Sequence, residues 1–352
     1  MREGSPTLRL NPYIAVLLLS PRPDLSITTL VRSNDKEAHL KSLGVTTLKG
    51  DLDDEELIAE AAGKADIIIH AATADHLPSA RAIIKGIQQR LNKSSKLIYI
   101  HTSGAAVVAE DARRSAGTTF SDLEPEKLDQ QVSDSAPHRG IDLHIRDQLG
   151  NPKSEKEHNA RVAILLPPII YGLGTGPLNN LSITVPALYR ATIDQGTGVS
   201  IGDGKNVYDA VHVRDLADAY LRILREMEGT DPGSGGGPYW FAETEQFEFR
   251  ALTQRVSSAL QSYGKSDGKV TKASEDDHDR LIGAFGAFFP PSLADADSDT
   301  KANAIAILWV VFGSNSITKA DRLRKLGWGL APGRLSILDS VEREEIPYLA
   351  SR

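Results

Sequence analysis

The chain has 352 residues, of which 40% are apolar and 25% are charged, as is typical of a globular protein and not of a disordered or fibrous one. The formal net charge of −7 provides no basic field, so neither nucleic acid nor a membrane surface is expected as a partner. Cysteine is absent, which excludes disulfides, thiolate metal sites and a cysteine nucleophile. The histidines are scattered; His138 and His144 fall in a polar region without a metal-ligand cluster, so no metal is expected.

Two apolar runs, Tyr13 to Leu19 and Ala304 to Phe312, are much shorter than the roughly 20 residues of a bilayer-spanning helix. No small-residue cleavage site follows the first run, so it is not typical of a signal peptide. We expect both runs to be core segments and the chain to be a soluble, cytoplasmic protein.

The first 166 residues alternate short β-branched runs with helical stretches. Strands are predicted at 26–31, 45–48, 65–70, 97–101 and 161–166, and helices at 35–43, 53–62 and 77–91. The later strands are nearly continuous apolar runs, as in a parallel sheet that is buried on both faces. The pattern therefore predicts an α/β fold with helices covering both faces of a parallel sheet.

The second half is less regular. Residues 110–159 are polar and contain three scattered prolines, which predicts loops with one weak helix. Further on, the predicted elements are a helix within 177–193, a tight turn at 202–205, a helix at 215–226, a strand at 239–242, a helix at 250–263 and two short helices within 319–350. We expect a core at residues 1–170, and at 171–352 a mixed region in which some strands return to the sheet and the rest forms a smaller lobe.

Four stretches of the chain, taken in order, resemble the extended short-chain dehydrogenase/reductase family, which includes the NAD-dependent epimerases and dehydratases and atypical, uncharacterised fungal members. The stretches are Leu30 to Ala72 with Gly50-Asp51-Leu52 and His70-Ala71-Ala72; Ile100 to Gly104; Leu166 to Gly172 followed by Gly202 to Asn206 and Val211 to Ala217; and Lys319 to Trp328. The resemblance covers about residues 13–345. It implies a Rossmann-type doubly wound parallel sheet that binds NAD(P), with a smaller C-terminal substrate lobe.

Three of the implied cofactor residues follow the second and third strands of this fold. Arg32 comes directly after the strand at 26–31, where a guanidinium can bind a ribose 2′-phosphate and favours NADP over NAD. The alternative is a plain surface arginine. Asp51 and Leu52 are similar to the pair that contacts adenine, although Asp51 could instead cap the following helix.

The remaining implied contacts lie at the ends of the next strands. Ala71 and Ala72 are small enough for the backbone to approach the cofactor, or simply allow a helix to pack on the sheet. Thr102 ends the strand at 97–101. Pro167 and Pro168 would shape the wall beside the nicotinamide.

The start of the chain departs from the family pattern. The family needs a first strand followed by G-x-x-G-x-x-G, but only Gly4 precedes Gly44, and residues 1–12 are neither a buried strand nor a phosphate loop. Tyr13 to Ser20 resembles the first helix. If Tyr13 to Leu19 were instead the strand, too few residues would remain before Ser26 for a crossover helix. We therefore expect the first strand and the glycine-rich loop to be missing or replaced, by a wrong first exon or by a real loss of cofactor binding.

The catalytic pattern is also incomplete. Typical members use Tyr-x-x-x-Lys, with the tyrosine as general acid or base, yet no tyrosine occurs from Thr102 to Leu166. Ser103 is the best hydroxyl for orienting a substrate. One alternative is that the family's serine position falls on Gly104, with Ser103 one residue early, and another is that the Ser103 hydroxyl binds only local backbone. Tyr171 is the second candidate proton donor; the alternative is a packed ring that lines the substrate loop.

Three hypotheses follow from these observations. The first is an NAD(P)-dependent oxidoreductase or epimerase-like enzyme acting on a small carbonyl, alcohol or nucleotide-sugar-like substrate. The second is a catalytically silent NADP-binding regulator or scaffold of the same fold, and the third is a chain with a defective N-terminus. The first is favoured, with a small-molecule partner and a homodimer as the assembly that the resemblance suggests. His70, His101 and His212, at strand ends, are interpreted as structural.

Overall fold

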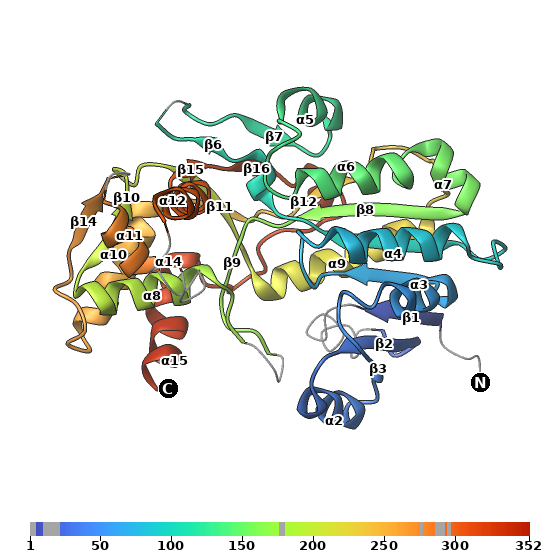
Figure 1. Ribbon diagram of the computed structural model, residues 1–352, viewed down its shortest axis with the longest axis horizontal. Helices are drawn as coiled ribbons and strands as arrows, with labels where there is room; N and C mark the ends of the chain where they lie inside the picture. Colours follow the sequence, from blue (N-terminus) through green and yellow to red (C-terminus); the bar gives the residue numbers. More distant parts are fainter. Residues whose placement is uncertain are drawn as a thin grey trace.

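The computed structural model describes residues 5–9, 22–113, 115–175, 180–274, 277–285, 293 and 297–352. Its main feature is a seven-stranded sheet in the order β12-β8-β5-β4-β1-β2-β3, in which all strands run parallel (Figure 1). The strands are β1 Ser5–Arg9, β2 Leu25–Val31, β3 Thr46–Lys49, β4 Ile67–His70, β5 Leu97–Thr102, β8 Ala160–Leu166 and β12 Tyr239–Phe241. The order reverses between β1 and β4, as in a doubly wound Rossmann sheet, so the predicted fold class is confirmed.

A first strand is present in the sheet at Ser5–Arg9, so the interpretation that residues 1–12 do not form a strand is wrong. The backbone of β1 pairs in parallel with β2 on one side and with β4 on the other, with Thr7 opposite both Ile27 and Ile67. Pro6 lies before the pairing with β4 begins, at the position in a strand where a residue without an N–H is tolerated. A β-ladder is held by hydrogen bonds between backbone groups, whereas a sequence pattern reflects only the side chains. The pattern therefore does not reveal this short strand. The residues on which the predicted loss of the glycine-rich loop, the predicted first helix and the first predicted core segment fall lie outside the described residues.

The helices beside the sheet agree with the predicted ones. They are α2 Asn34–Ser42, α3 Glu55–Lys64, α4 Leu77–Gln88 and α9 Val213–Gly229, with ends within three residues of the prediction. α2 ends just before Gly44, whose φ of 81° is the left-handed conformation that glycine adopts cheaply after a helix. α3 packs against α4, and α9 packs against β5.

Residues 110–159 are more ordered than predicted. They form β6 Glu110–Asp111, β7 Thr119–Ser121, α5 Pro125–Gln131, α6 Arg139–Gln148 and α7 Pro152–His158, and a 3₁₀ turn at Ala105–Val108 precedes them. The prediction of loops with one weak helix is wrong because α6 buries Arg139 and Asp142 together with Ile141 and Ile145. A buried face that is half polar shows no apolar period in the sequence.

A second group of elements packs around its own cluster of buried apolar residues (Figure 1). Its elements are β9 Ile169–Tyr171, α8 Thr184–Gln195, β10 Gly198–Ile201, β11 Val207–His212, β13 Glu245–Glu248, α10 Phe249–Gln261, β14 Val270–Ala273, α11 His278–Phe285, α12 Ser298–Phe312, α14 Ile337–Ser340, a π-helical turn Val341–Glu345 and α15 Ile346–Ala350. Between them in the chain, β15 Ser314–Asn315 pairs with β6 and β16 Ile317–Lys319 pairs with β7, and α13 Asp321–Lys325 contributes Leu323 to the core of the main sheet. The run Ala304 to Phe312 lies on α12 and contributes Ile305 and Leu308 to this core. No helix in the described ranges is long and apolar enough to cross a bilayer.

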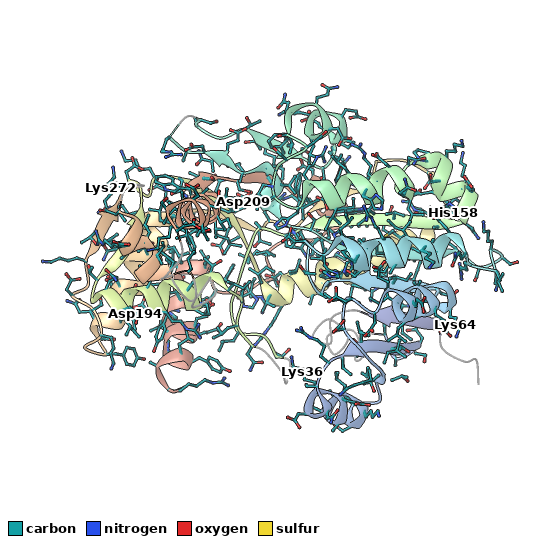
Figure 2. The ribbon with its side chains drawn as sticks, viewed as in Figure 1. Lys36, Lys64, His158, Asp194, Asp209 and Lys272 are labelled. Carbon is teal, nitrogen blue, oxygen red and sulfur yellow. The ribbon has the colours of Figure 1, made fainter. Side chains whose placement is uncertain are left out.

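Buried polar contacts join the last part of the chain to this lobe. Asp209 of β11, labelled in Figure 2, accepts hydrogen bonds from the Thr318 hydroxyl of β16 at 2.8 Å and from the Gln246 side chain at 2.9 Å. β12 pairs with β8 of the main sheet, and α9 packs against β5.

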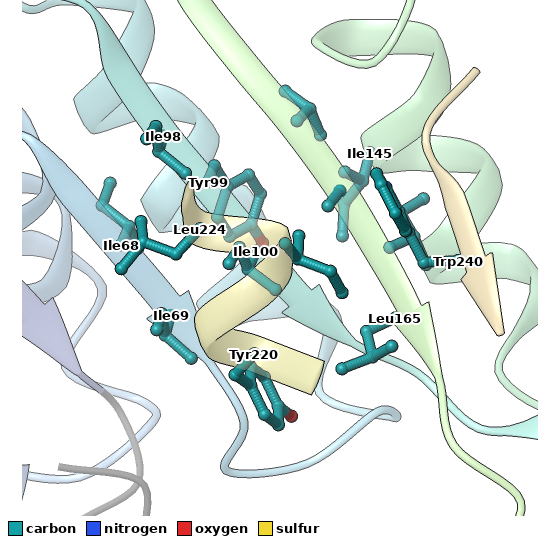
Figure 3. Packing of buried hydrophobic residues seen from close by; sticks show 14 of the residues in the cluster. Ile68, Ile69, Ile98, Tyr99, Ile100, Ile145, Leu165, Tyr220, Leu224 and Trp240 are labelled. Atoms are coloured by element: carbon teal, nitrogen blue, oxygen red, sulfur yellow. The ribbon is translucent and has the colours of Figure 1, made fainter. Parts of the chain in front are cut away.

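The core of the main sheet lies next to the strand ends. Figure 3 shows Tyr220 and Leu224 of α9 beside Ile69 and Ile100 of the sheet, with further helices on the far side of the strands. Residues after β4 and β5 are therefore held by rigid packing on both faces of the sheet.

Candidate functional site

The predicted cofactor residues lie at one edge of the main sheet. Arg32 directly follows β2, Asp51 follows β3, Ala71 follows β4, Thr102 ends β5 and Pro167 follows β8. Because all these strands are parallel, their carboxyl ends share one edge. That edge includes the point where the strand order reverses, which is where open α/β sheets bind ligands.

The residues after β2 and β3 differ in the contacts that their side chains make within the protein. Arg32 is exposed, and among the described residues it has no ion-pair or hydrogen-bond partner. Asp51 is exposed, and its carboxylate accepts from the backbone N–H of Asp53 at 2.9 Å, so it shapes the turn into α3. Leu52 packs against the main core. This turn contact is local, but it is not the helix cap that was the alternative for Asp51, because Asp54 is the N-cap residue of α3.

The residues after β4, β5 and β8 are mostly packed. Ala71 lies against the main core, whereas Ala72 is exposed. The hydroxyls of Thr102 and Tyr220 are 2.5 Å apart. Pro167 and Pro168 are buried, and the carbonyl of Pro167 accepts from the N–H that follows Gly104 at 2.9 Å.

These residues fit the adenosine end of a dinucleotide. Arg32 supplies an exposed guanidinium for a phosphate, and the exposed Ala72 leaves the backbone beside the switch point accessible. The segment between β1 and β2, which would face the pyrophosphate, contains no glycine in residues 10–21 and lies outside the described residues.

Tyr171 takes the packed role that was its alternative. Its side chain is fully buried, its hydroxyl donates to the carbonyl of Leu335 at 2.9 Å, and its ring meets His212 edge-on with centroids 5.2 Å apart. Burial raises the pKa of Tyr171 far above its ordinary value. The structure therefore does not bring Tyr171 to the strand ends as a proton donor.

Ser103 contacts a buried carboxyl group. Its hydroxyl donates to Oδ2 of Asp142 at 2.7 Å, so the expected bond to local backbone is not what holds it. Asp142 is fully buried on α6, and its other oxygen, Oδ1, has no partner among the described residues. Burial raises the pKa of Asp142 from its ordinary 3.8 to about 7, although the bond from Ser103 partly opposes the shift.

Two buried histidines continue from this group. Nδ1 of His101 is 3.0 Å from Nδ1 of His70, and Nε2 of His70 is 3.2 Å from the Ser79 hydroxyl, which donates to the carbonyl of His76. Burial lowers the pKa of His70 to about 3 and that of His101 well below its usual range, so both rings are neutral. Because the Ser79 proton is directed at the carbonyl, His70 must donate from Nε2 and accept at Nδ1. His101 must then donate from Nδ1.

This tautomer assignment has a consequence for Asp142. Nε2 of His101 is then an acceptor without a partner, and it lies 3.9 Å from the unpartnered Oδ1 of Asp142. A proton on that oxygen would face the free lone pair of His101. The geometry therefore agrees with the raised pKa of Asp142, and both favour the protonated form of this carboxyl group in the native state. His70 and His101 are part of this buried network.

A third histidine lies at the surface of the same region. His138 immediately precedes α6, and its Nδ1 is 2.6 Å from Oδ1 of Asp75 in the loop after β4. A Cβ placed on Gly104 would lie 3.2 Å from Nε2 of His138, so this glycine leaves room for the imidazole.

His138 and Asp142 were not among the site residues that the sequence predicted. They are four residues apart, the spacing of Tyr-x-x-x-Lys, and Asp142 donates its N–H to the carbonyl of His138. A search for titratable pairs at this helical spacing before the strand at 161–166 could have found them. The structure brings them to Ser103 and Gly104, but not to Tyr171. No group of three His, Asp or Glu side chains in the described part of the chain could hold a metal.

Comparisons with known proteins agree with this architecture. The model of the NAD dependent epimerase/dehydratase family matches residues 152–234. An oxidase from Acremonium sp, ucsJ, is 31% identical over 271 residues, which cover 71% of this chain and 76% of that protein. A probable pinoresinol-lariciresinol reductase 3 from Arabidopsis thaliana is 33% identical over 84 residues, which cover 24% of this chain and 28% of that protein.

Solved structures share the fold over almost the whole chain. A dTDP-glucose 4,6-dehydratase from Bacillus anthracis in complex with NAD has a TM-score of 0.65 at 11% identity, covering 99% of this chain and 97% of that one. A UDP-glucose 4-epimerase from Thermotoga maritima with UDP-glucose has a TM-score of 0.61 at 13% identity, covering 98% and 99%. At these identities the likeness concerns the fold alone.

Proposed function

Since this chain belongs to the NAD-dependent epimerase/dehydratase family, we propose that it is an NAD(P)-dependent oxidoreductase or epimerase-like enzyme that acts on a small carbonyl, alcohol or nucleotide-sugar-like substrate. The observation that carries the proposal is the gathering of Arg32, Asp51, Ala71 and Thr102 at the edge where the strand order reverses. A bound nicotinamide would supply hydride chemistry, and the chain would position the reactants and set the polarity around them.

Arg32 and the pair Asp51 and Leu52 would hold the adenosine end, and Pro167 and Pro168 would lie toward the nicotinamide end. Arg32 supports NADP as the preferred cofactor, because an exposed guanidinium with no partner among the described residues can bind a 2′-phosphate with two hydrogen bonds. The dehydratase from Bacillus anthracis was solved with NAD, so NAD is the comparison that any binding test needs.

Replacing Arg32 with alanine is expected to weaken NADPH binding about 10- to 100-fold and to leave NADH binding unchanged. The reason is that only NADPH has the 2′-phosphate, and a charge-assisted contact to it contributes about 1.5–3 kcal/mol. Calorimetric titration of the purified full chain with each nucleotide measures both affinities. Lys85→Ala removes an exposed cation from α4 and serves as the control for lost charge. An equal loss for NADPH and NADH, or no binding of either to the folded wild type, would contradict the proposal.

A catalytically silent NADP-binding protein is the second candidate function. It is favoured by the absence of any tyrosine from Thr102 to Leu166 and by the hydrogen bond that the Ser103 hydroxyl donates to Asp142. Such a protein would bind NADPH but would not consume it with any aldehyde or ketone. Robust hydride transfer to a carbonyl compound would exclude it.

A further inference from the structure

His138 lies where a substrate at the end of β5 would need a proton-transferring group. The imidazole has one nitrogen, Nδ1, held by the Asp75 carboxylate at 2.6 Å. The other nitrogen, Nε2, faces Gly104 just beyond the end of β5. The side chain is 21% exposed, so the ring is open to a ligand, whereas the Ser103 hydroxyl is buried against Asp142.

The backbone of His138 is held in a costly conformation. Its φ of 65° is left-handed, which a residue with a Cβ rarely adopts, and its side chain does not cap α6. Such a conformation persists only where the surrounding contacts stabilise it by more than it costs, and it occurs most often at functional sites. In this conformation the ring contacts Asp75 and lies beside Gly104.

A second observation points to the same place. Asp142, one helical turn after His138, is a buried carboxyl group whose Oδ1 lacks a partner among the described residues. Unsatisfied buried polar atoms are rare in folded proteins and call for an explanation. Asp142 binds the Ser103 hydroxyl at 2.7 Å on the buried side of the end of β5, and His138 lies beside the next residue, Gly104.

We propose that Nε2 of His138 transfers the proton to or from the substrate oxygen, and that Asp75 positions the ring by accepting from Nδ1. This inference rests on the proposed function. In the direction of reduction, a carbonyl carbon gains a hydride as the nicotinamide is oxidised, and the C=O electron pair moves onto the oxygen. That oxygen forms an O–H bond with the proton that leaves Nε2 of the imidazolium, and water returns a proton to the ring. In the direction of oxidation, Nε2 of the neutral ring takes the hydroxyl proton.

The test compares His138→Gln and Asp75→Ala with the wild-type full chain, and it uses His144→Gln on the same helix as the matched control. NADPH binding is measured by calorimetry, and turnover is measured as NADPH consumption with 4-nitrobenzaldehyde as the carbonyl probe. Nitrogen NMR of the histidine rings, which needs neither cofactor nor substrate, identifies the tautomer of His138.

We expect His138→Gln to lower kcat about 100-fold while the NADPH affinity stays within about twofold, because general acid–base groups contribute at least this much. His144→Gln should leave both unchanged. The neutral His138 ring should carry its proton on Nδ1 in the wild type, and Asp75→Ala should shift the proton toward Nε2 and lower kcat about tenfold.

The failures can be told apart. If the folded wild type binds neither NADPH nor NADH, the proposed function fails, and the tautomer measurement still decides whether Asp75 positions His138. If the wild type binds NADPH but does not consume it with the probe, or if His138→Gln retains wild-type kcat, the assignment of His138 is overturned while the cofactor site stands. A wild-type ring protonated on Nε2 would overturn the role of Asp75.

Discussion

Replacing Gly86 with alanine is expected to destabilise the folded chain by about 2–3 kcal/mol, a cost typical of overpacking a tight core. A Cβ on Gly86 of α4 would lie 2.3 Å from the carbonyl oxygen of Ala59 and 2.8 Å from Cβ of Ala62, both on α3. The closest atom belongs to the backbone, so no flexible side chain can move away. The two helices would have to separate, and the buried side chains of Ile83 and Ile87 would lose part of their packing.

Urea unfolding followed by circular dichroism measures this cost, and Gly140→Ala is the matched control. Gly140 lies on α6, and a Cβ there would meet nothing within 4 Å. Alanine at Gly140 is therefore expected to stabilise the chain by about 0.5 kcal/mol, through its higher helix propensity. The two substitutions are chemically identical, so effects of the same sign would contradict the close approach of α3 and α4.

Replacing Asp142 with asparagine is expected to stabilise the chain at pH 8 by about 2–4 kcal/mol relative to the wild type, and to do so much less at pH 4.5. Burial raises the pKa of Asp142 from 3.8 to about 7, so between these pH values the native state keeps a proton that the unfolded chain has lost. The unfolded state then binds fewer protons, and the free energy of unfolding of the wild type falls as the pH rises from about 4 to about 7. Asparagine does not titrate, so the variant avoids this loss.

The local geometry favours asparagine as the replacement. Its carbonyl oxygen can still accept from the Ser103 hydroxyl, and its amide group can face the free Nε2 of His101, where the wild type has the unpartnered Oδ1. The variant therefore tests the charge without opening a cavity.

Urea unfolding of both proteins at intervals from pH 4.5 to pH 8.5 gives the difference directly, because groups common to both proteins cancel. Asp147→Asn removes an exposed carboxylate from the same helix, and it should change the free energy of unfolding by no more than about 0.5 kcal/mol throughout. A stability difference for Asp142→Asn that does not change with pH would show that Asp142 is ionised in the native state and that the raised pKa is wrong.

Local pattern was sufficient for most of the main sheet and its helices. The strands at 26–31, 65–70 and 97–101 and the helices at 35–43, 53–62 and 77–91 lie within three residues of where periodicity placed them. Their side chains are buried on a single face or on both faces, so the hydrophobic period is visible in the sequence itself. The ordered motifs then predicted the Rossmann class and the edge of the sheet that carries the candidate cofactor residues.

β1 and α6 are among the elements that the sequence did not predict, because their sequence pattern does not show the period of their structure. β1 is a short strand whose place is set by backbone bonds to β2 and β4, and α6 buries charged and apolar side chains together. In both cases neighbouring elements supply the partners, so the segment alone does not reveal its conformation.

The sequence by itself determined the α/β class, the positions of the predicted strands along the chain and the absence of the usual tyrosine. Only the tertiary structure decided which polar groups lie beside Ser103 and Gly104. His138 and Asp75 are 63 residues apart, and Ser103 and Asp142 are 39 apart. Periodicity reports which face of an element is buried, but the pairing of polar groups across such separations depends on how the elements pack. The chemistry of this site therefore follows from contacts that no local pattern encodes.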